Sequence, residues 1–163
     1  MPRTRTADPI AERPHMPGYG IAEGEEGLLP WSWARERLEA CRNYFVSSTQ
    51  PDGRPHLMPV WAVWHDNRLY FSTAKTSRKA RNLYANPACS VAIEGGAEAL
   101  IVEGRAVTTD DAAVLKPVWK AYKQKYDWSI DNEPMFVLHP THAFAFIETA
   151  NRFSSTATRW RFG

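Results

Sequence analysis

The feature that most constrains the fold of this chain is a series of short, β-rich runs separated by tight-turn signals. Residues 44–49 favour a strand and lead into Gln50-Pro51-Asp52-Gly53, which predicts a hairpin into the apolar run at 57–64. Asp66-Asn67 and Gly95-Gly96 mark further tight turns. Runs this short, joined by such turns, pair in antiparallel order, so we expect a mainly β protein of the α+β type.

The rest of the pattern adds a few short helices and completes the strands. Ser32 is a candidate N-cap for a helix that ends near residue 43, and Ser77 caps a second helix. Residues 110–126 have a helical stripe, with Pro117 expected to break or restart it. The further strands expected are 68–73, 89–94, 98–108, 135–139 and 142–148. About six antiparallel strands with short helices suit a closed or nearly closed barrel.

Two cations stand at the start of the helix that opens at Ser77. Arg78 and Lys79 occupy its first positions, where the helix dipole disfavours positive charge. Their presence indicates that an anion shares the site. A phosphate group would accept bonds from the first-turn amides, the Arg fork and the Lys ammonium. A solvated basic turn is the alternative that the sequence leaves open.

Composition narrows the function classes. The 163 residues fit one domain, and a net charge of +2 is too small to indicate a nucleic-acid partner. No run of 18 apolar residues is present, so we expect no membrane span. Cys41 and Cys89 lie in no metal-binding or redox spacing and favour small buried residues of a cytoplasmic protein, with a disulfide between them as the alternative.

The chain divides into a leader and a domain. Residues 1–27 hold four prolines and four glycines and have no apolar periodicity, so we expect a flexible or extended leader. Residues 28–163 form the expected domain.

Several motifs resemble those of the flavin/deazaflavin oxidoreductases in the pyridoxamine 5'-phosphate oxidase-like superfamily. They stand at 51–56, 59–61, 69–73, 77–83 and 86–87. The resemblance covers residues 30–148, and Ser-Arg-Lys-Ala at 77–80 is a fairly specific element of it. It implies a split β-barrel of about six strands and a homodimer with the cofactor in the groove between subunits.

The resemblance also implies positions for the cofactor. Arg78 and Lys79 match its phosphate ligands, the segment 59–61 matches the strand along its ring, and Trp160 matches a residue that closes the site. The expected cofactor-binding residues are Pro59, Val60, Trp61, Ser72, Thr73, Lys75, Ser77, Arg78, Lys79, Asn82 and Trp160.

Departures from the family pattern bear on the cofactor. Basic residues that flank the flavin strand in pyridoxamine-phosphate oxidases are replaced here by Met58 and Val63, and the C-terminal Arg-Leu-His-Asp-Arg motif is missing. Lys75 can meet negative charge beyond the phosphate, such as the oligoglutamate tail of coenzyme F420. These features favour F420, with FMN as the alternative.

No catalytic side chain and no metal site are expected. Hydride transfer is the cofactor's chemistry, and the protein supplies orientation and charge. His139 and His142 flank Pro140 but have no third ligand nearby, and zinc sites need three or four.

Three functions follow as hypotheses. The first is an F420-dependent oxidoreductase that transfers a hydride between reduced F420 and an unsaturated or quinone-like small molecule, with an FMN enzyme as its variant. The second is a flavin or deazaflavin carrier or sensor, and the third, least favoured, is a nucleic-acid binder. The doubly apolar run at 57–64 and the seven tryptophans predict a homodimer. Trp61 and Trp64, three apart on a strand, are expected to face opposite sides.

Overall fold

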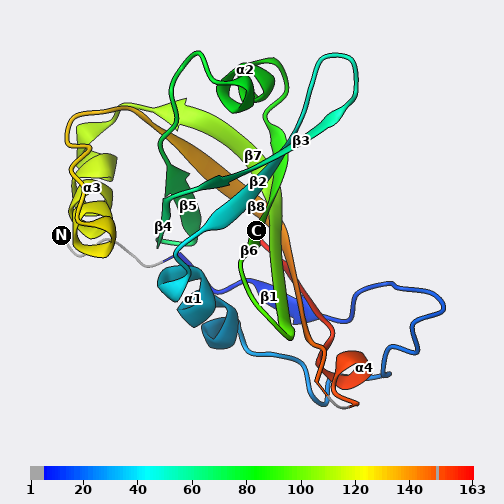
Figure 1. Ribbon diagram of the computed structural model, residues 1–163. Helices are drawn as coiled ribbons and strands as arrows, with labels where there is room; N and C mark the ends of the chain where they lie inside the picture. The colour runs from blue at the N-terminus through cyan, green and yellow to red at the C-terminus, as the bar shows by residue number, and fades with distance from the viewer. Residues whose placement is uncertain (1–5, 150) are drawn as a thin grey trace.

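Nine strands and four helices form within residues 6–149 and 151–163, the part of the chain described by this computed structural model (Figure 1). The strands are β1 (Ile10–Glu12), β2 (Tyr44–Thr49), β3 (Pro55–Val60), β4 (Ala62–His65), β5 (Arg68–Phe71), β6 (Ala88–Ile93), β7 (Glu98–Thr109), β8 (Met135–Ile147) and β9 (Thr158–Arg161). The helices are α1 (Trp31–Ala40), α2 (Arg78–Ala85), α3 (Ala112–Tyr126) and α4 (Phe153–Thr156).

All strand pairs are antiparallel and belong to one curved sheet. Its order is β1-β9-β8-β7-β6-β2-β3, and β4 and β5 form a hairpin that joins β8. One end of β8 pairs with β5 through residues 136–138, and the other end pairs with β9 through residues 142–145. The strand is therefore shared by both parts of a split barrel, with α2 and α3 outside the sheet in Figure 1.

The expected fold class is confirmed, but the strands are more numerous than expected. The apolar run at 57–64 is divided at Trp61 into the end of β3 and the whole of β4. The segments expected at 135–139 and 142–148 form one continuous strand, β8. β1 and β9, which pair with each other, had no strong signal of their own.

The segment expected to be a flexible leader is packed on the domain from residue 6 onward. β1 extends the sheet beside β9. The Arg13 guanidinium donates hydrogen bonds to the carbonyls of Ser155 (2.8 Å) and Ala157 (2.9 Å), and to those of Gly24 and Glu26. These four acceptors hold the loop that follows β1 against the C-terminal end of the chain. Residues 1–5 of the expected leader lie outside the described residues.

Two apolar clusters hold these elements together. One fills the barrel around Trp160, Phe71 and Leu138. The other lies between α3 and the β4–β5 hairpin and contains the predicted α3 stripe: Leu115, Trp119, Tyr122 and Tyr126. Pro117 lies inside α3 without ending it, because packing on this stripe outweighs the lost backbone hydrogen bond.

Gly104 marks the bulge where β7 and β8 change register. A Cβ added there would overlap the carbonyl oxygen of His139 on β8. We expect Gly104→Ala to lower the free energy of unfolding by about 2–3 kcal/mol, as overpacking against fixed backbone does. Urea denaturation measures the effect. Gly96→Ala is the matched control, because its Cβ would meet open space. Equal midpoints for the two variants would contradict this role of the bulge.

Candidate functional site

A cavity of about 350 Å³ opens where β3 ends, next to the last residues of the β4–β5 hairpin. It is lined by Asn43, Pro59, Val60, Trp61, Ser72, Thr73, Lys79 and Tyr122. Six of these belong to the expected cofactor-binding set, and they come from three separate stretches of the chain. The division of the apolar run at Trp61 creates the cavity's aromatic side.

The start of α2 forms the polar end of this cavity. Ser77 is the N-cap, as expected, and its hydroxyl accepts a hydrogen bond from the Ala80 amide at 3.1 Å. Thr73 Oγ1 lies 3.1 Å from Ser77 Oγ, which links the end of β5 to the helix start. Arg78 follows the cap and is exposed to solvent. First-turn amides without helical acceptors therefore stand at the same end of α2 as Arg78.

Lys79 is the most unusual group at this site. Its side chain is only 8% exposed, and its Nζ donates one long hydrogen bond, 3.3 Å, to Thr73 Oγ1. No carboxylate among the described residues pairs with it. Burial lowers the pKa of this ammonium below its ordinary value. A buried cation without an anion is costly, so the position indicates a ligand of negative charge.

Five expected residues do not line this cavity: Ser77 and Arg78, which stand beside it at the start of α2, and Asn82, Trp160 and Lys75. Asn82 is fully buried on α2, where its Nδ2 donates to Ser48 Oγ at 3.1 Å and its Oδ1 has no partner among the described residues. Trp160 is also fully buried, with its ring 5.4 Å from that of Trp31. β9 lies between β1 and β8 and turns this side chain into the barrel, away from the cavity that it was expected to close.

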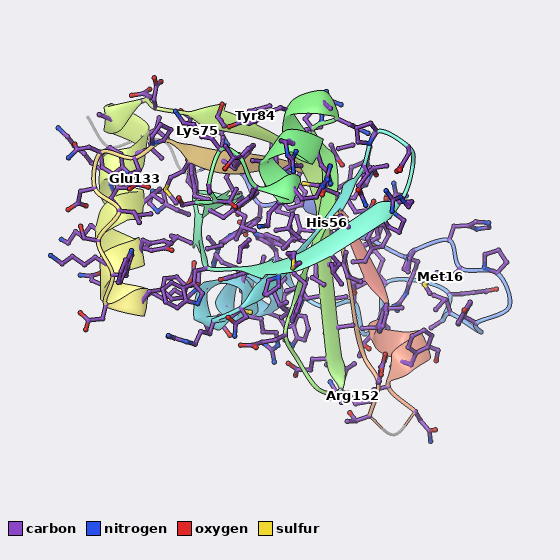
Figure 2. All side chains as sticks on the ribbon, turned by 45° about the horizontal axis from the view of Figure 1, so that its top comes forward. Met16, His56, Lys75, Tyr84, Glu133 and Arg152 are labelled. Atoms are coloured by element: carbon purple, nitrogen blue, oxygen red, sulfur yellow. The ribbon has the colours of Figure 1, made fainter. Side chains whose placement is uncertain are left out.

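Lys75 lines a second cavity of about 320 Å³ on the other side of Thr73. Tyr84, Phe136 and Asp110 also line it, and Figure 2 shows Lys75 and Tyr84 at the same end of the molecule, beside α2. Thr73 therefore lines both cavities, and it also contacts the helix start through Ser77.

The sequence analysis missed the aromatic side of the first cavity. Trp61 stacks on Tyr126 of α3, with ring centroids 4.7 Å apart and planes 7° from parallel. The Arg42 guanidinium lies 5.4 Å from both ring centroids. Tyr122 contributes the α3 side of the cavity, and burial raises the pKa of its phenol. The available signal was the presence of tyrosine hydroxyls, rather than leucines, in the apolar stripe of α3. Trp64 packs against Trp31 in the core, so the two tryptophans do separate as expected.

A half-buried lysine, Lys125, supports this aromatic side. Lys125 Nζ donates to Tyr44 Oη at 2.7 Å and to the carbonyls of Glu39 (3.1 Å) and Ala62 (3.2 Å). Burial lowers its pKa to about 8. Unlike Lys79, it has three close acceptors, which suits a structural role joining α3, α1 and the start of β4.

Metal ligands do not cluster in the described part of the chain: no three His, Cys, Asp or Glu side chains lie close enough to hold an ion. His142 Nε2 lies 2.7 Å from Arg159. Within residues 6–149 and 151–163, no helix has the length and apolar character needed to cross a membrane.

One of the comparisons with known proteins identifies a family. A family model described as pyridoxamine 5'-phosphate oxidase matches residues 33–150. No curated protein matches the chain. A conserved hypothetical protein from Mycobacterium tuberculosis is 17% identical, with a TM-score of 0.67, covering 79% of this chain and 91% of its own.

Two further solved structures have similar folds. An F420 reductase is 24% identical, with a TM-score of 0.55, covering 67% of this chain and 94% of its own. A pyridoxamine 5'-phosphate oxidase-related, FMN-binding protein from Nostoc punctiforme is 17% identical, with a TM-score of 0.54. The match covers 76% of this chain and 87% of that protein.

Lys79 also yields a prediction about stability. Replacing it with methionine keeps the apolar stem and removes a buried charge that has one weak partner. We expect Lys79→Met to raise the free energy of unfolding of the ligand-free protein by about 1 kcal/mol, the usual gain when a functional group that strains the fold is removed. Urea denaturation measures it. Lys120→Met, at an exposed position on α3, is the control. A loss of stability specific to Lys79→Met would instead assign the lysine a structural role.

Proposed function

The chain belongs to the pyridoxamine 5'-phosphate oxidase family, and from that premise we propose that it is an F420-dependent oxidoreductase. In this proposal it transfers a hydride between reduced F420 and an unsaturated or quinone-like small molecule. When bound, the cofactor supplies the hydride chemistry, and the chain supplies binding, orientation and exclusion of water.

The observation that carries the proposal is the unpaired, buried Lys79 at the capped start of α2. A cofactor phosphate there neutralises the ammonium and accepts bonds from the first-turn amides and from Arg78. The 350 Å³ cavity extends from this point along Pro59, Val60 and Trp61, so a planar ring attached to the phosphate has apolar walls beside it. Tyr122 lines the same cavity, and burial raises the pKa of its phenol above the ordinary value.

The choice of F420 over FMN rests on Lys75 more than on Met58 and Val63, the apolar residues that stand where related oxidases have basic ones. Val63 is buried against α3, so a residue at this position does not face the cavity. Lys75, by contrast, stands in the adjoining cavity beyond Thr73 and has no carboxylate partner among the described residues. An acidic tail that continues past the phosphate meets this cation, whereas FMN ends at its phosphate. The FMN enzyme stays the second candidate, because both cofactors share the ring and the phosphate.

Burial of Lys79 weakens the nucleic-acid hypothesis. A groove for a polyanion needs exposed cations along its length, and this lysine is almost wholly enclosed. Arg78, Arg81 and Lys75 stay exposed, which leaves a cluster too short for such a groove.

Fluorescence titration with F420 and with FMN tests the proposal. We expect F420 to bind more tightly than FMN. The difference between the two affinities should become smaller at high salt, because salt screens the contact between the acidic tail and Lys75. Lys79→Met should weaken the binding of both cofactors about 30-fold, because it removes a hydrogen bond to a charged group. Lys75→Gln should weaken the binding of F420 and leave the binding of FMN unchanged. Stoichiometric FMN in the purified protein, with no F420 binding at low salt, would overturn the choice of cofactor.

We also propose a homodimer, on the basis of a row of apolar residues across the outer face of the sheet. Register places Pro59 beside Phe45, Phe45 beside Ala92, Ala92 beside Ile101 and Ile101 beside Phe144. Pro59 is exposed, and the other four residues of the row are half-buried. Leu57, on the same edge strand β3, is 60% exposed. Apolar surface of this extent favours a partner, and a second copy covers it symmetrically.

Light scattering at micromolar concentration measures the assembly. We expect twice the 18.5 kDa of one chain. Leu57→Lys should shift the mass toward the monomer, because it puts a charge into the apolar face. Trp128→Lys, a change at an equally exposed residue away from this face, is the control. A monomeric mass for the unmodified protein would refute the dimer.

A further inference from the structure

Trp61 presents an exposed aromatic surface that the structure holds rigidly. Its side chain is 37% exposed, and one ring face is covered by Tyr126 at 4.7 Å. The backbone after it is fixed from the same helix, because the Ala62 amide donates to Tyr126 Oη at 2.9 Å. A ring held in place before binding loses little conformational entropy when a planar ligand stacks on it.

Arg42 supplies a free cation beside this surface. Its guanidinium lies 5.4 Å from the centroids of Trp61 and Tyr126, and its side chain is exposed. Its backbone carbonyl accepts a hydrogen bond of 2.8 Å from Tyr126 Oη. Within residues 6–149 and 151–163, no carboxylate forms an ion pair with it. The residue that follows, Asn43, lines the cavity.

Other charged groups lie near Arg42. Lys125 adds a second cation nearby. Glu94 accepts a hydrogen bond from Asn43, and the Glu39 carboxylate acts on the Lys125 ammonium. Arg42 is therefore a cation beside the aromatic pair that no carboxylate of the described residues pairs with. A planar ring with a negative group at one end fits both halves of this surface, since Arg bonds carboxylates with a two-pronged geometry.

We propose that the hydride acceptor is a planar, conjugated carboxylic acid that stacks on Trp61 with its carboxylate on Arg42. This assignment rests on the proposed function. When bound, reduced F420 would supply the hydride. The acceptor would gain a C–H bond at a carbon conjugated to a carbonyl other than its carboxylate, the π electron pair would move to that carbonyl oxygen, and the oxygen would take a proton from water. The acceptor would thereby be reduced by two electrons, while the reduced cofactor would be oxidised by two electrons and release one proton to water.

Two probes of equal shape test the binding site directly. Isothermal titration calorimetry compares 2-naphthoate with 2-naphthamide, which lacks the negative charge. We expect 2-naphthoate to bind about 10-fold more tightly, the range for one charge-assisted contact at an accessible site. Equal affinities would overturn the proposal.

Variants assign the preference to particular residues. Arg42→Gln should abolish the preference for the carboxylate and leave 2-naphthamide binding unchanged. Trp61→Ala should weaken both probes. Lys120→Gln removes the same unit of charge from an exposed site on α3 and should alter neither. A preference that survives Arg42→Gln would exclude Arg42 as the carboxylate partner.

Repeating the titration with F420-saturated protein separates this proposal from the function on which it rests. Retention of the preference identifies an acceptor site beside the cofactor. Displacement of F420 by 2-naphthoate would mean that the surface belongs to the cofactor ring, which overturns the acceptor assignment. Failure of F420 to bind at all overturns the proposed function, while the cofactor-free titration still decides whether Trp61 and Arg42 bind a planar anion.

Discussion

The long antiparallel pairing of β7 with β8 is the interaction on which the rest of the structure depends. It runs through twelve paired positions, with the register shift after Glu103. On the two sides of that bulge, β8 pairs with different strands along its other edge, β9 through residues 142–145 and β5 through residues 136–138, so the β4–β5 hairpin joins the sheet there. β5 then leads directly into Thr73 and the cap of α2. The place of the helix start, and with it the cationic end of the cavity, is therefore set by a strand register established more than fifty residues further along the chain.

Buried Lys79 and half-buried Lys125 show how partners distinguish a structural charge from one that can serve a ligand. Lys125 has two carbonyls and a phenol within 3.2 Å, so its charge is solvated by the protein itself. Lys79 has a single hydroxyl at 3.3 Å. Both have lowered pKa values for the same reason, burial. Only Lys79 lacks the acceptors that make burial tolerable, and a ligand that brings them gains the most binding free energy at this position.

The sequence predicted interactions between residues that lie close together along the chain, and it missed those between residues that lie far apart. The capped start of α2 lies within a few residues of Thr73, so the spacing of Ser77 and Lys79 was enough to predict it. Trp61 and Tyr126 are 65 residues apart, and nothing in either segment indicates that they stack. The inward position of Trp160 likewise depends on β9 lying between two other strands. The contacts of the expected leader are equally non-local: its proline and glycine content gave no sign that Arg13 would reach carbonyls at 155 and 157.

Pro59 connects the cavity to the proposed dimer. It lines the cavity with its neighbours Val60 and Trp61, and it also begins the apolar row that crosses the outer face of the sheet. If a second copy packs on that face while a cofactor lies along the cavity, both contact this short segment of β3. Their binding equilibria would then be linked, and the cofactor would stabilise the dimer by the same factor by which dimerisation would strengthen cofactor binding.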